Sequence, residues 1–154
     1  MELLLWRHAE AAQTTPDLER ALTPAGREQA AVMANWLRSR LPKNTRVLVS
    51  PARRTQETAA ALGMDFITCD AIAPGAEPEE ILEAAGWLNA QQDVLIVSHQ
   101  PSLGAAAALA ISGHDQRWDI EIGNLWWLSS ETHDGSAHAV LRAIIPAELA
   151  AAQK

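Results

Sequence analysis

Residues 2–10 have the sequence ELLLWRHAE, in which a short apolar run ends abruptly in Arg7 and His8. The run predicts a strand over residues 2–6, because a continuous apolar stretch of this length is typical of a strand buried on both faces. A cation and an imidazole have no evident packing role at its end. Open α/β sheets carry their functional sites at the carboxyl ends of their strands. We therefore expect a site after this strand; a strand that simply emerges into solvent is the alternative.

Strands and helices alternate along the rest of the chain. Thr23 and Ser50 each precede a proline and predict helix starts, since the hydroxyl caps the helix and proline suits its first turn. After the first strand we expect a loop over residues 10–20 and further strands over 46–49, 65–68 and 93–97, followed by two strands near 120–129 and 137–145. The predicted helices run from Thr23 to Leu41, from Ser50 to Leu62, from Pro78 onward, and from Pro101 to Gly113. In the helix that starts at Pro78, the side chains expected to face inward are Ile81, Leu82, Ala85 and Leu88. This order predicts a three-layer α/β/α sandwich whose mostly parallel central sheet ends in a C-terminal antiparallel hairpin.

Composition limits the class of protein and its partners. The 154 residues are 48% apolar, which suits one globular domain spanning residues 1–154. A net charge of −7 disfavours nucleic acid and anionic membranes as partners. The lone Cys69 excludes an internal disulfide and fits a reducing compartment. Since no apolar stretch resembles a signal peptide or a membrane span, we expect a cytoplasmic protein. The sequence does not fix the oligomeric state, and a monomer is favoured.

Polar residues follow three of the predicted strands at the point where each strand ends. Arg7-His8 follows the first strand, Ser50-Pro51-Ala52-Arg53-Arg54-Thr55 the second, and Ser98-His99 the fourth. If these strands are parallel, two histidines and two or three arginines gather at one edge of the sheet. Helix N-termini bind anions, and guanidinium groups match phosphate oxygens in pairs. These residues therefore predict a phosphate pocket.

Two histidines in a phosphate pocket indicate phosphoryl transfer. A neutral imidazole can attack phosphorus and form a covalent intermediate, while a second imidazole donates a hydrogen bond to the phosphoryl oxygens. Arginines neutralise the charge of the transition state, so this chemistry needs neither a metal nor a cofactor. Two alternatives stay open. One is a metal site of His8, His99 and Glu10, which the arginines would disfavour by repulsion; the other is a pair of core histidines without a chemical role.

The segments Arg7-His8, Ser50-Pro51-x-x-Arg54-Thr55 and Ser98-His99, in this order and at this spacing, resemble the histidine phosphatase superfamily with its phosphoglycerate-mutase-like fold. The opening of the first helix, Leu22-Thr23-Pro24-Ala25-Gly26, followed by Gln29-Ala30, is similar too. The resemblance spans nearly the whole chain and makes that fold, without a cap domain, the expected one.

The resemblance also implies roles for individual residues. His8 would be the nucleophile that becomes phosphorylated, and Arg7, Arg54 and His99 would form the rest of the phosphate pocket. Further candidates for substrate binding are Ser50 and Glu10. Arg53 falls outside the motif, and we expect it at the surface or in contact with the substrate.

The chain departs from the larger members of this superfamily. Ala9 stands where they carry glycine. The stretch between Thr68 and Val94 leaves little room for the inserted segments that cover their site and supply a carboxylic general acid. The candidates for such an acid are Glu10, Glu77, Glu79 and Glu80, although the last three also fit a helix start, where acidic residues are favourable.

A short chain without a cap most resembles the SixA-type phosphohistidine phosphatases, which act on phosphohistidine in histidine-containing phosphotransfer proteins. We therefore expect a phosphatase that forms phospho-His8, with such a phosphorylated protein or another phosphoprotein as its partner. A protonated imidazole leaves easily, so a dedicated acid matters less for this substrate. The alternatives are a phosphatase of small phosphomonoesters and a non-catalytic module that binds phosphoproteins.

Overall fold

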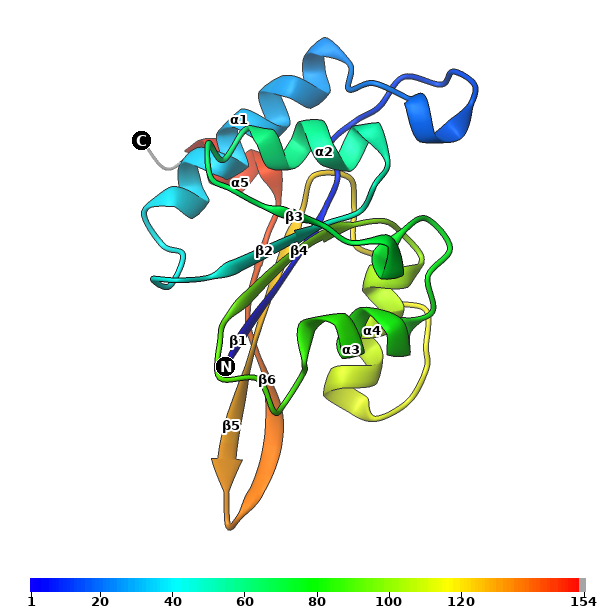
Figure 1. The fold of residues 1–154 in the computed structure, drawn as a ribbon. Coiled ribbons are helices and arrows are strands. Elements are labelled where there is room, and N and C mark those ends of the chain that lie inside the picture. The colour runs from blue at the N-terminus through cyan, green and yellow to red at the C-terminus, as the bar shows by residue number, and fades with distance from the viewer. Residues whose placement is uncertain (153–154) are drawn as a thin grey trace.

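A six-stranded mixed sheet forms the centre of the structure, a computed structural model that describes residues 1–152 (Figure 1). The strands are β1 (Glu2–Arg7), β2 (Arg46–Val49), β3 (Ile67–Thr68), β4 (Val94–Ser98), β5 (Leu125–His133) and β6 (Ser136–Ile145). Their order across the sheet is β3-β2-β4-β1-β5-β6. The pairs β3–β2, β2–β4 and β4–β1 are parallel, whereas β5 and β6 pair antiparallel. The expected parallel sheet with a C-terminal hairpin is confirmed.

Helices cover both faces of this sheet. They are α1 (Pro24–Arg38), α2 (Arg53–Ala60), α3 (Pro78–Ala85), α4 (Ser102–Ser112) and α5 (Ala147–Ala152), with short 3-10 helices η1 (Asp17–Glu19) and η2 (Asp70–Ile72). Figure 1 shows α1, α2 and α5 on one face and α3 and α4 on the other. The three-layer prediction is therefore confirmed. Between β3 and β4 the chain forms only η2 and α3, so no cap domain is inserted there.

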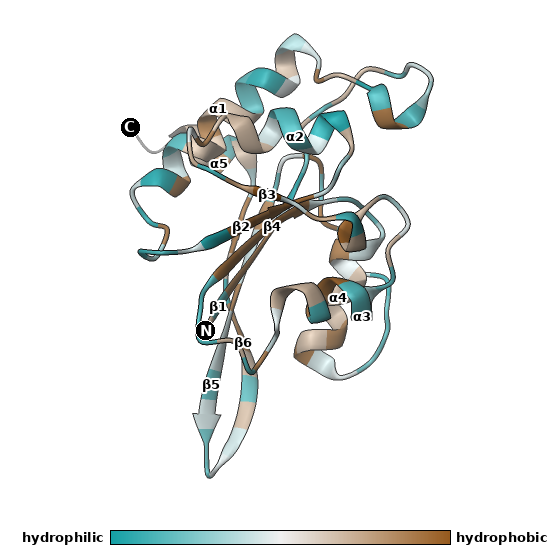
Figure 2. Ribbon diagram, in the orientation of Figure 1, coloured by the Kyte–Doolittle hydropathy of each residue, from teal (hydrophilic) through white to brown (hydrophobic). Residues whose placement is uncertain are grey.

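Alternation along the central strands divides the core between the two faces, because successive side chains of a strand point in opposite directions. Leu4 and Trp6 of β1 pack with Met33 of α1 on one face. Leu5 packs with Leu103 of α4 on the other face. The central strands are accordingly the most hydrophobic part of the sheet in Figure 2. Burial on both faces explains why their sequence is a continuous apolar run.

The start of α1 follows its sequence signals. Thr23 Oγ1 accepts a hydrogen bond from Gly26 N at 3.0 Å, and Pro24 occupies the first turn, as expected. Gly26 is required by a close approach: a Cβ at this position would lie 2.0 Å from the carbonyl oxygen of Glu10. The segment after β1 and the start of α1 are thereby held against each other.

The predicted start of the second helix at Ser50 is wrong. Helix α2 begins at Arg53, with Ala52 at its N-cap position and no side-chain cap. The Ser50 hydroxyl instead lies 2.7 Å from Nε2 of His99, across the edge of the sheet. The Ser50 hydroxyl, which the local sequence predicted to cap the helix, therefore contacts the distant His99.

Leu88 does not face inward as predicted. Helix α3 ends at Ala85, and Gly86 adopts a left-handed conformation with a φ of 66°, which turns the chain out of the helix. Leu88 itself is 39% exposed. Ile81 and Ala85 are buried as expected.

Other boundaries also differ from the sequence predictions. Strand β3 is shorter than the predicted 65–68, and α5 follows the last strand without having been predicted. Strand β5 begins at Leu125 rather than near residue 120, because the preceding residues turn at Gly123, whose φ is 76°. Among residues 1–152, no helix has the length and apolar character needed to cross a bilayer.

Candidate active site

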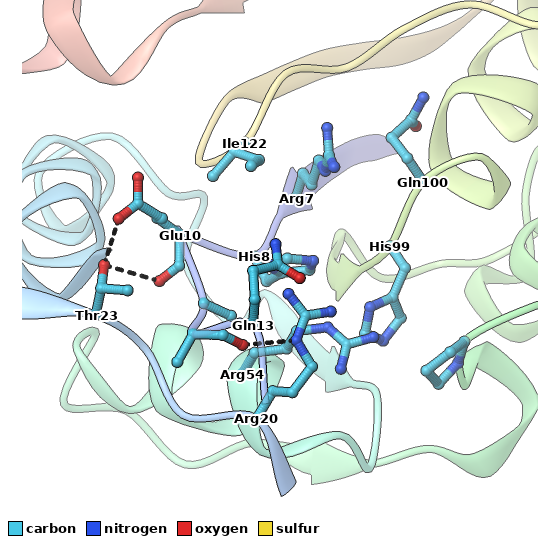
Figure 3. Close-up of a pocket in the computed structure, with 13 residues that line it drawn as sticks. Arg7, His8, Glu10, Gln13, Arg20, Thr23, Arg54, His99, Gln100 and Ile122 are labelled. Carbon is cyan, nitrogen blue, oxygen red and sulfur yellow. Dashed lines mark hydrogen bonds between the residues drawn. The ribbon is translucent and has the colours of Figure 1, made fainter. Parts of the chain in front are cut away.

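The carboxyl ends of β1, β2 and β4 meet at one edge of the sheet. Arg7 pairs in register with Ser98, and Val49 with Val97, so the residues that follow these strands become neighbours. The imidazole rings of His8 and His99 have their centroids 5.3 Å apart. They lie in a pocket of about 580 Å³ (Figure 3), lined by Arg7, His8, Glu10, Ala11, Ala12, Gln13, Arg20, Thr23, Arg54, Pro74, His99, Gln100 and Ile122.

His8 is held in one orientation and one tautomer. Its Nδ1 lies 2.7 Å from the carbonyl oxygen of Ala9. A carbonyl can only accept, so Nδ1 carries the proton and Nε2 keeps a free lone pair. Burial lowers the pKa of His8 from 6.5 to about 4; the Ala9 hydrogen bond opposes this, and the charges of Arg54 and Arg7 add to it. His8 is therefore neutral at physiological pH.

His99 makes a polar contact with Ser50. Its Nε2 lies 2.7 Å from Ser50 Oγ, and that oxygen also accepts a 3.4 Å hydrogen bond from the amide of Ala52. This contact holds the ring of His99 beside that of His8. Within the described residues Nδ1 is buried and has no hydrogen-bond partner. Burial, followed by the charge of Arg54, lowers the pKa of His99 to about 3.

Two arginines are anchored so that part of each guanidinium remains unpaired. Arg7 Nη1 donates to the carbonyl of Ile120 at 2.8 Å. Arg54 Nη1 donates to the carbonyl of Asp17 at 2.9 Å, and Nη2 lies 3.2 Å from its carboxylate. In the described part of the chain, Nε of both arginines is buried without a partner. An unpaired buried donor beside a pocket is costly unless a ligand accepts from it.

Arg20 is a pocket residue that the sequence analysis missed. Its Nε donates to the carbonyl of Ala12 at 2.8 Å, and its Nη1 lies 3.3 Å from Asp17. The carboxylate of Asp17 thus bridges Arg20 and Arg54. Burial raises the pKa of Asp17, but hydrogen bonds and charges from both arginines outweigh this and lower it. No sequence signal marks Arg20, because it lies in the loop before α1, where no periodicity applies.

Glu10 lies at the rim of the pocket and faces away from the histidines. Its Oε1 accepts a hydrogen bond from Thr23 Oγ1 at 2.7 Å, and Figure 3 shows the side chain turned toward Thr23. No group of His, Cys, Asp and Glu within residues 1–152 comes together so that it could hold a metal ion. The alternative metal site of His8, His99 and Glu10 is therefore not assembled.

The other candidate acids lie outside the pocket. Glu77 and Glu80 form the capping box of α3, in which Glu80 Oε2 accepts from the amide of Glu77 at 2.8 Å. Glu79 does not line the pocket either. Arg53 also lies outside it, exposed and 2.9 Å from the carboxylate of Glu57. Of the acids considered, Glu10 alone reaches the site.

Several known proteins are similar to this chain in sequence or in fold. Residues 3–72 match the family model of the histidine phosphatase superfamily (branch 1). The chain is 35% identical over 118 residues to an uncharacterised protein of Mycobacterium tuberculosis, covering 71% of this chain and 73% of that protein. It is 30% identical over 117 residues to phosphohistidine phosphatase SixA of Escherichia coli (strain K12), covering 70% of this chain and 73% of that protein. The solved structure of the protein histidine phosphatase SixA complexed with tungstate superposes with a TM-score of 0.76 at 23% identity, covering 96% of this chain and 97% of that one.

Proposed function

The chain belongs to the histidine phosphatase superfamily, branch 1, and is a phosphatase; on that premise we propose that it hydrolyses phosphohistidine in a histidine-containing phosphotransfer protein. The observation that carries the proposal is the state of His8. A neutral imidazole with Nδ1 bonded to a carbonyl presents Nε2 as a nucleophile inside a cationic pocket.

The proposed reaction has two steps. Nε2 of His8 attacks phosphorus in line with the P–N bond to the substrate imidazole. The substrate imidazole enters with a proton on its other ring nitrogen. When the P–N bond breaks, its electron pair stays on the substrate nitrogen, so the substrate leaves as a neutral imidazole while phospho-His8 forms. A water molecule then attacks phosphorus, the bond to Nε2 breaks, and inorganic phosphate departs while His8 returns to its neutral form.

Charge neutralisation is the task of the surrounding side chains. Arg7, Arg54 and Arg20 line the pocket and are each anchored to a backbone carbonyl. Preorganised donors of this kind stabilise the charge on the three phosphoryl oxygens in the transition state. The neutral imidazole of His99 lines the same pocket and adds a polar group beside His8. Ser50 acts through His99, by holding its ring.

The pocket offers a single carboxylate, at its rim, as a possible general acid, and this favours phosphohistidine as the substrate. Glu10 is the only Asp or Glu among the lining residues, and it is hydrogen-bonded to Thr23. An imidazole leaving group that carries a proton needs less help from an acid than an alkoxide does. The absence of an inserted cap between β3 and β4 leaves room for a protein-borne side chain. The E. coli relative is named a phosphohistidine phosphatase, which agrees with this choice.

A cytoplasmic location fits the lone cysteine.

The second candidate is a small phosphomonoester, which the same nucleophile and arginines could accept. A non-catalytic phosphoprotein-binding module is not favoured, because Arg7, His8, Arg54 and His99 all line one pocket.

Trapping the intermediate tests the proposal. We expect that mixing the protein with a phosphotransfer protein carrying radiolabelled phosphohistidine, followed by rapid quenching in base, transfers an acid-labile label to His8. The variant His8→Asn should take up no label and show no turnover. A label on another residue, or faster turnover of a phosphomonoester than of phosphohistidine, would overturn the mechanism or the substrate choice respectively.

A further inference from the structure

A second hollow adjoins the phosphate pocket. This α1–α5 groove has a volume of about 310 Å³ and is lined by Ala25, Glu28, Gln29, Val32, Ile122, Ala147, Glu148 and Ala151. Ile122 lines both hollows, so they share a wall. In Figure 3 Ile122 lies at the edge of the phosphate pocket, between Glu10 and Arg7. A macromolecule that places a side chain in the phosphate pocket from this side therefore covers the groove.

Most residues that line the groove are apolar. Val32 and three alanines line it, and Ile122 is 41% exposed at its end. Exposed apolar surface that continues from a functional pocket is typical of a binding surface. The small alanine side chains leave room between the two helices for an apolar side chain of a partner.

Two acidic residues also line the groove. Glu28 of α1 and Glu148 of α5 line it, and no cationic residue does. In the part of the chain that the structure describes, neither carboxylate forms an ion pair, whereas nearby Glu57 is paired with Arg53. A cationic pocket for phosphate thus lies beside an apolar groove with acidic edges. A partner that complements the phosphate pocket and the groove carries a phosphoryl group near an apolar side chain, with lysines or arginines on either side of that side chain.

We propose that the α1–α5 groove docks the phosphoprotein substrate through an amphipathic helix, whose apolar side chain enters the groove and whose lysines or arginines contact Glu28 and Glu148. Hollows between two helices accept side chains spaced three or four residues apart on a third helix. This inference rests on the proposed function, since it assigns the part of the substrate that lies outside the phosphate pocket.

Charge reversal tests the groove without touching the phosphate pocket. In the double variant Glu28→Arg/Glu148→Arg, we expect kcat/KM for a phosphorylated histidine-containing phosphotransfer protein to fall about tenfold at low salt, and the difference to shrink at high salt. Turnover of the free amino acid phosphohistidine should be unchanged. The matched control is Glu79→Arg/Glu83→Arg on α3, which changes the net charge equally on the other face of the sheet and should leave both activities unchanged.

Each other result overturns the inference. An equal decrease in kcat/KM for the phosphoprotein and for free phosphohistidine would mean that the substitutions disturb the phosphate pocket and do not remove a docking contact. Unchanged activity on the phosphoprotein would place the docking surface elsewhere. Dissociation of a wild-type oligomer by the same variant would make the groove a contact between two copies of the chain. Failure of the wild-type protein to act on any phosphoprotein, seen before a variant is made, would instead remove the proposed function itself.

Discussion

A single backbone carbonyl decides which nitrogen of His8 faces a substrate. The Ala9 carbonyl occupies Nδ1, so Nε2 is the atom available for attack. Ala9 itself is fixed, because its amide donates to Thr58 Oγ1 at 3.0 Å and its methyl group is buried against Leu22 and Ala30. The alanine methyl thus contributes to the packing behind His8.

The buried histidines give a prediction for titration. We expect the rings of His8 and His99 to stay neutral from about pH 8 down to about pH 5, because burial lowers their pKa values to about 4 and about 3. Nitrogen NMR shifts of 15N-histidine-labelled protein in anion-free buffer would show this, with His8 protonated on Nδ1. Adding tungstate should raise both pKa values, since an oxyanion favours the charged imidazole. An apparent pKa above about 6 without an anion would contradict the prediction.

Arg20 and Arg53 form a matched pair for mutation, since one lines the pocket and the other lies outside it. Arg20→Ala should weaken inhibition by phosphate or tungstate about tenfold to a hundredfold, as the loss of a charge-assisted hydrogen bond implies. Arg53→Ala, which removes an exposed ion pair with Glu57, should leave inhibition unchanged. Inhibition constants measured side by side would decide. Equal effects of the two variants would show that net charge, rather than a contact with the anion, is responsible.

The elements around the site are joined by hydroxyl groups of α2. Thr55 Oγ1 donates to the carbonyl of Ser50 at 2.9 Å, which ties the helix to the end of β2. Thr58 Oγ1 donates to the carbonyl of Arg54 and accepts from the amide of Ala9, which ties the same helix to the segment after β1. Helix α2 therefore sets the spacing between His8 and Arg54.

The contribution of Thr23 to the start of α1 can be tested by mutation. Thr23→Ala removes both the cap of Gly26 N and the hydrogen bond to Glu10, so the free energy of unfolding should fall by about 1 kcal/mol. Urea denaturation measures this directly. Thr23→Ser keeps the hydroxyl and should restore most of the loss. If serine were as destabilising as alanine, packing of the methyl group rather than capping would be the cause.

At the scale of the whole molecule, an acidic chain concentrates positive charge at one edge of its sheet. The net charge is −7, yet three arginines line the phosphate pocket. Keeping two neutral histidines beside them has a consequence for stability. The unfolded chain binds protons on these histidines near pH 6.5, whereas the folded chain does so only at lower pH.

Stability should consequently decrease as the pH falls through this range. Since the unfolded state binds more protons between about pH 6.5 and about pH 4, the free energy of unfolding should be lower at about pH 5 than at about pH 7, by roughly 2 kcal/mol for each histidine. Urea denaturation in anion-free buffer at the two pH values measures the difference. The variant His8→Gln/His99→Gln should show a flatter dependence, and an unchanged slope in that variant would assign the effect to other groups.

Much of the architecture followed from local patterns along the chain. Continuous apolar runs identified the two central strands, because a strand buried on both faces has no polar position. Proline after Thr23 marked the start of α1, and the arginine–histidine sequence at the end of β1 pointed to the edge of the sheet where the pocket lies. Patterns of this kind act over a few residues, which is why they can be read without the fold.

Only the tertiary structure decided the features that depend on distant partners. Ser50 bonds to His99 instead of capping α2, Arg20 enters the pocket from a loop, and Glu10 turns to Thr23. Each of these hydrogen bonds joins residues that are eight or more positions apart in the sequence, so the packing of the strands and helices determined which partner was within reach. The chain by itself thus determined the fold and the chemistry of its strand ends, whereas packing determined which polar groups line the pocket.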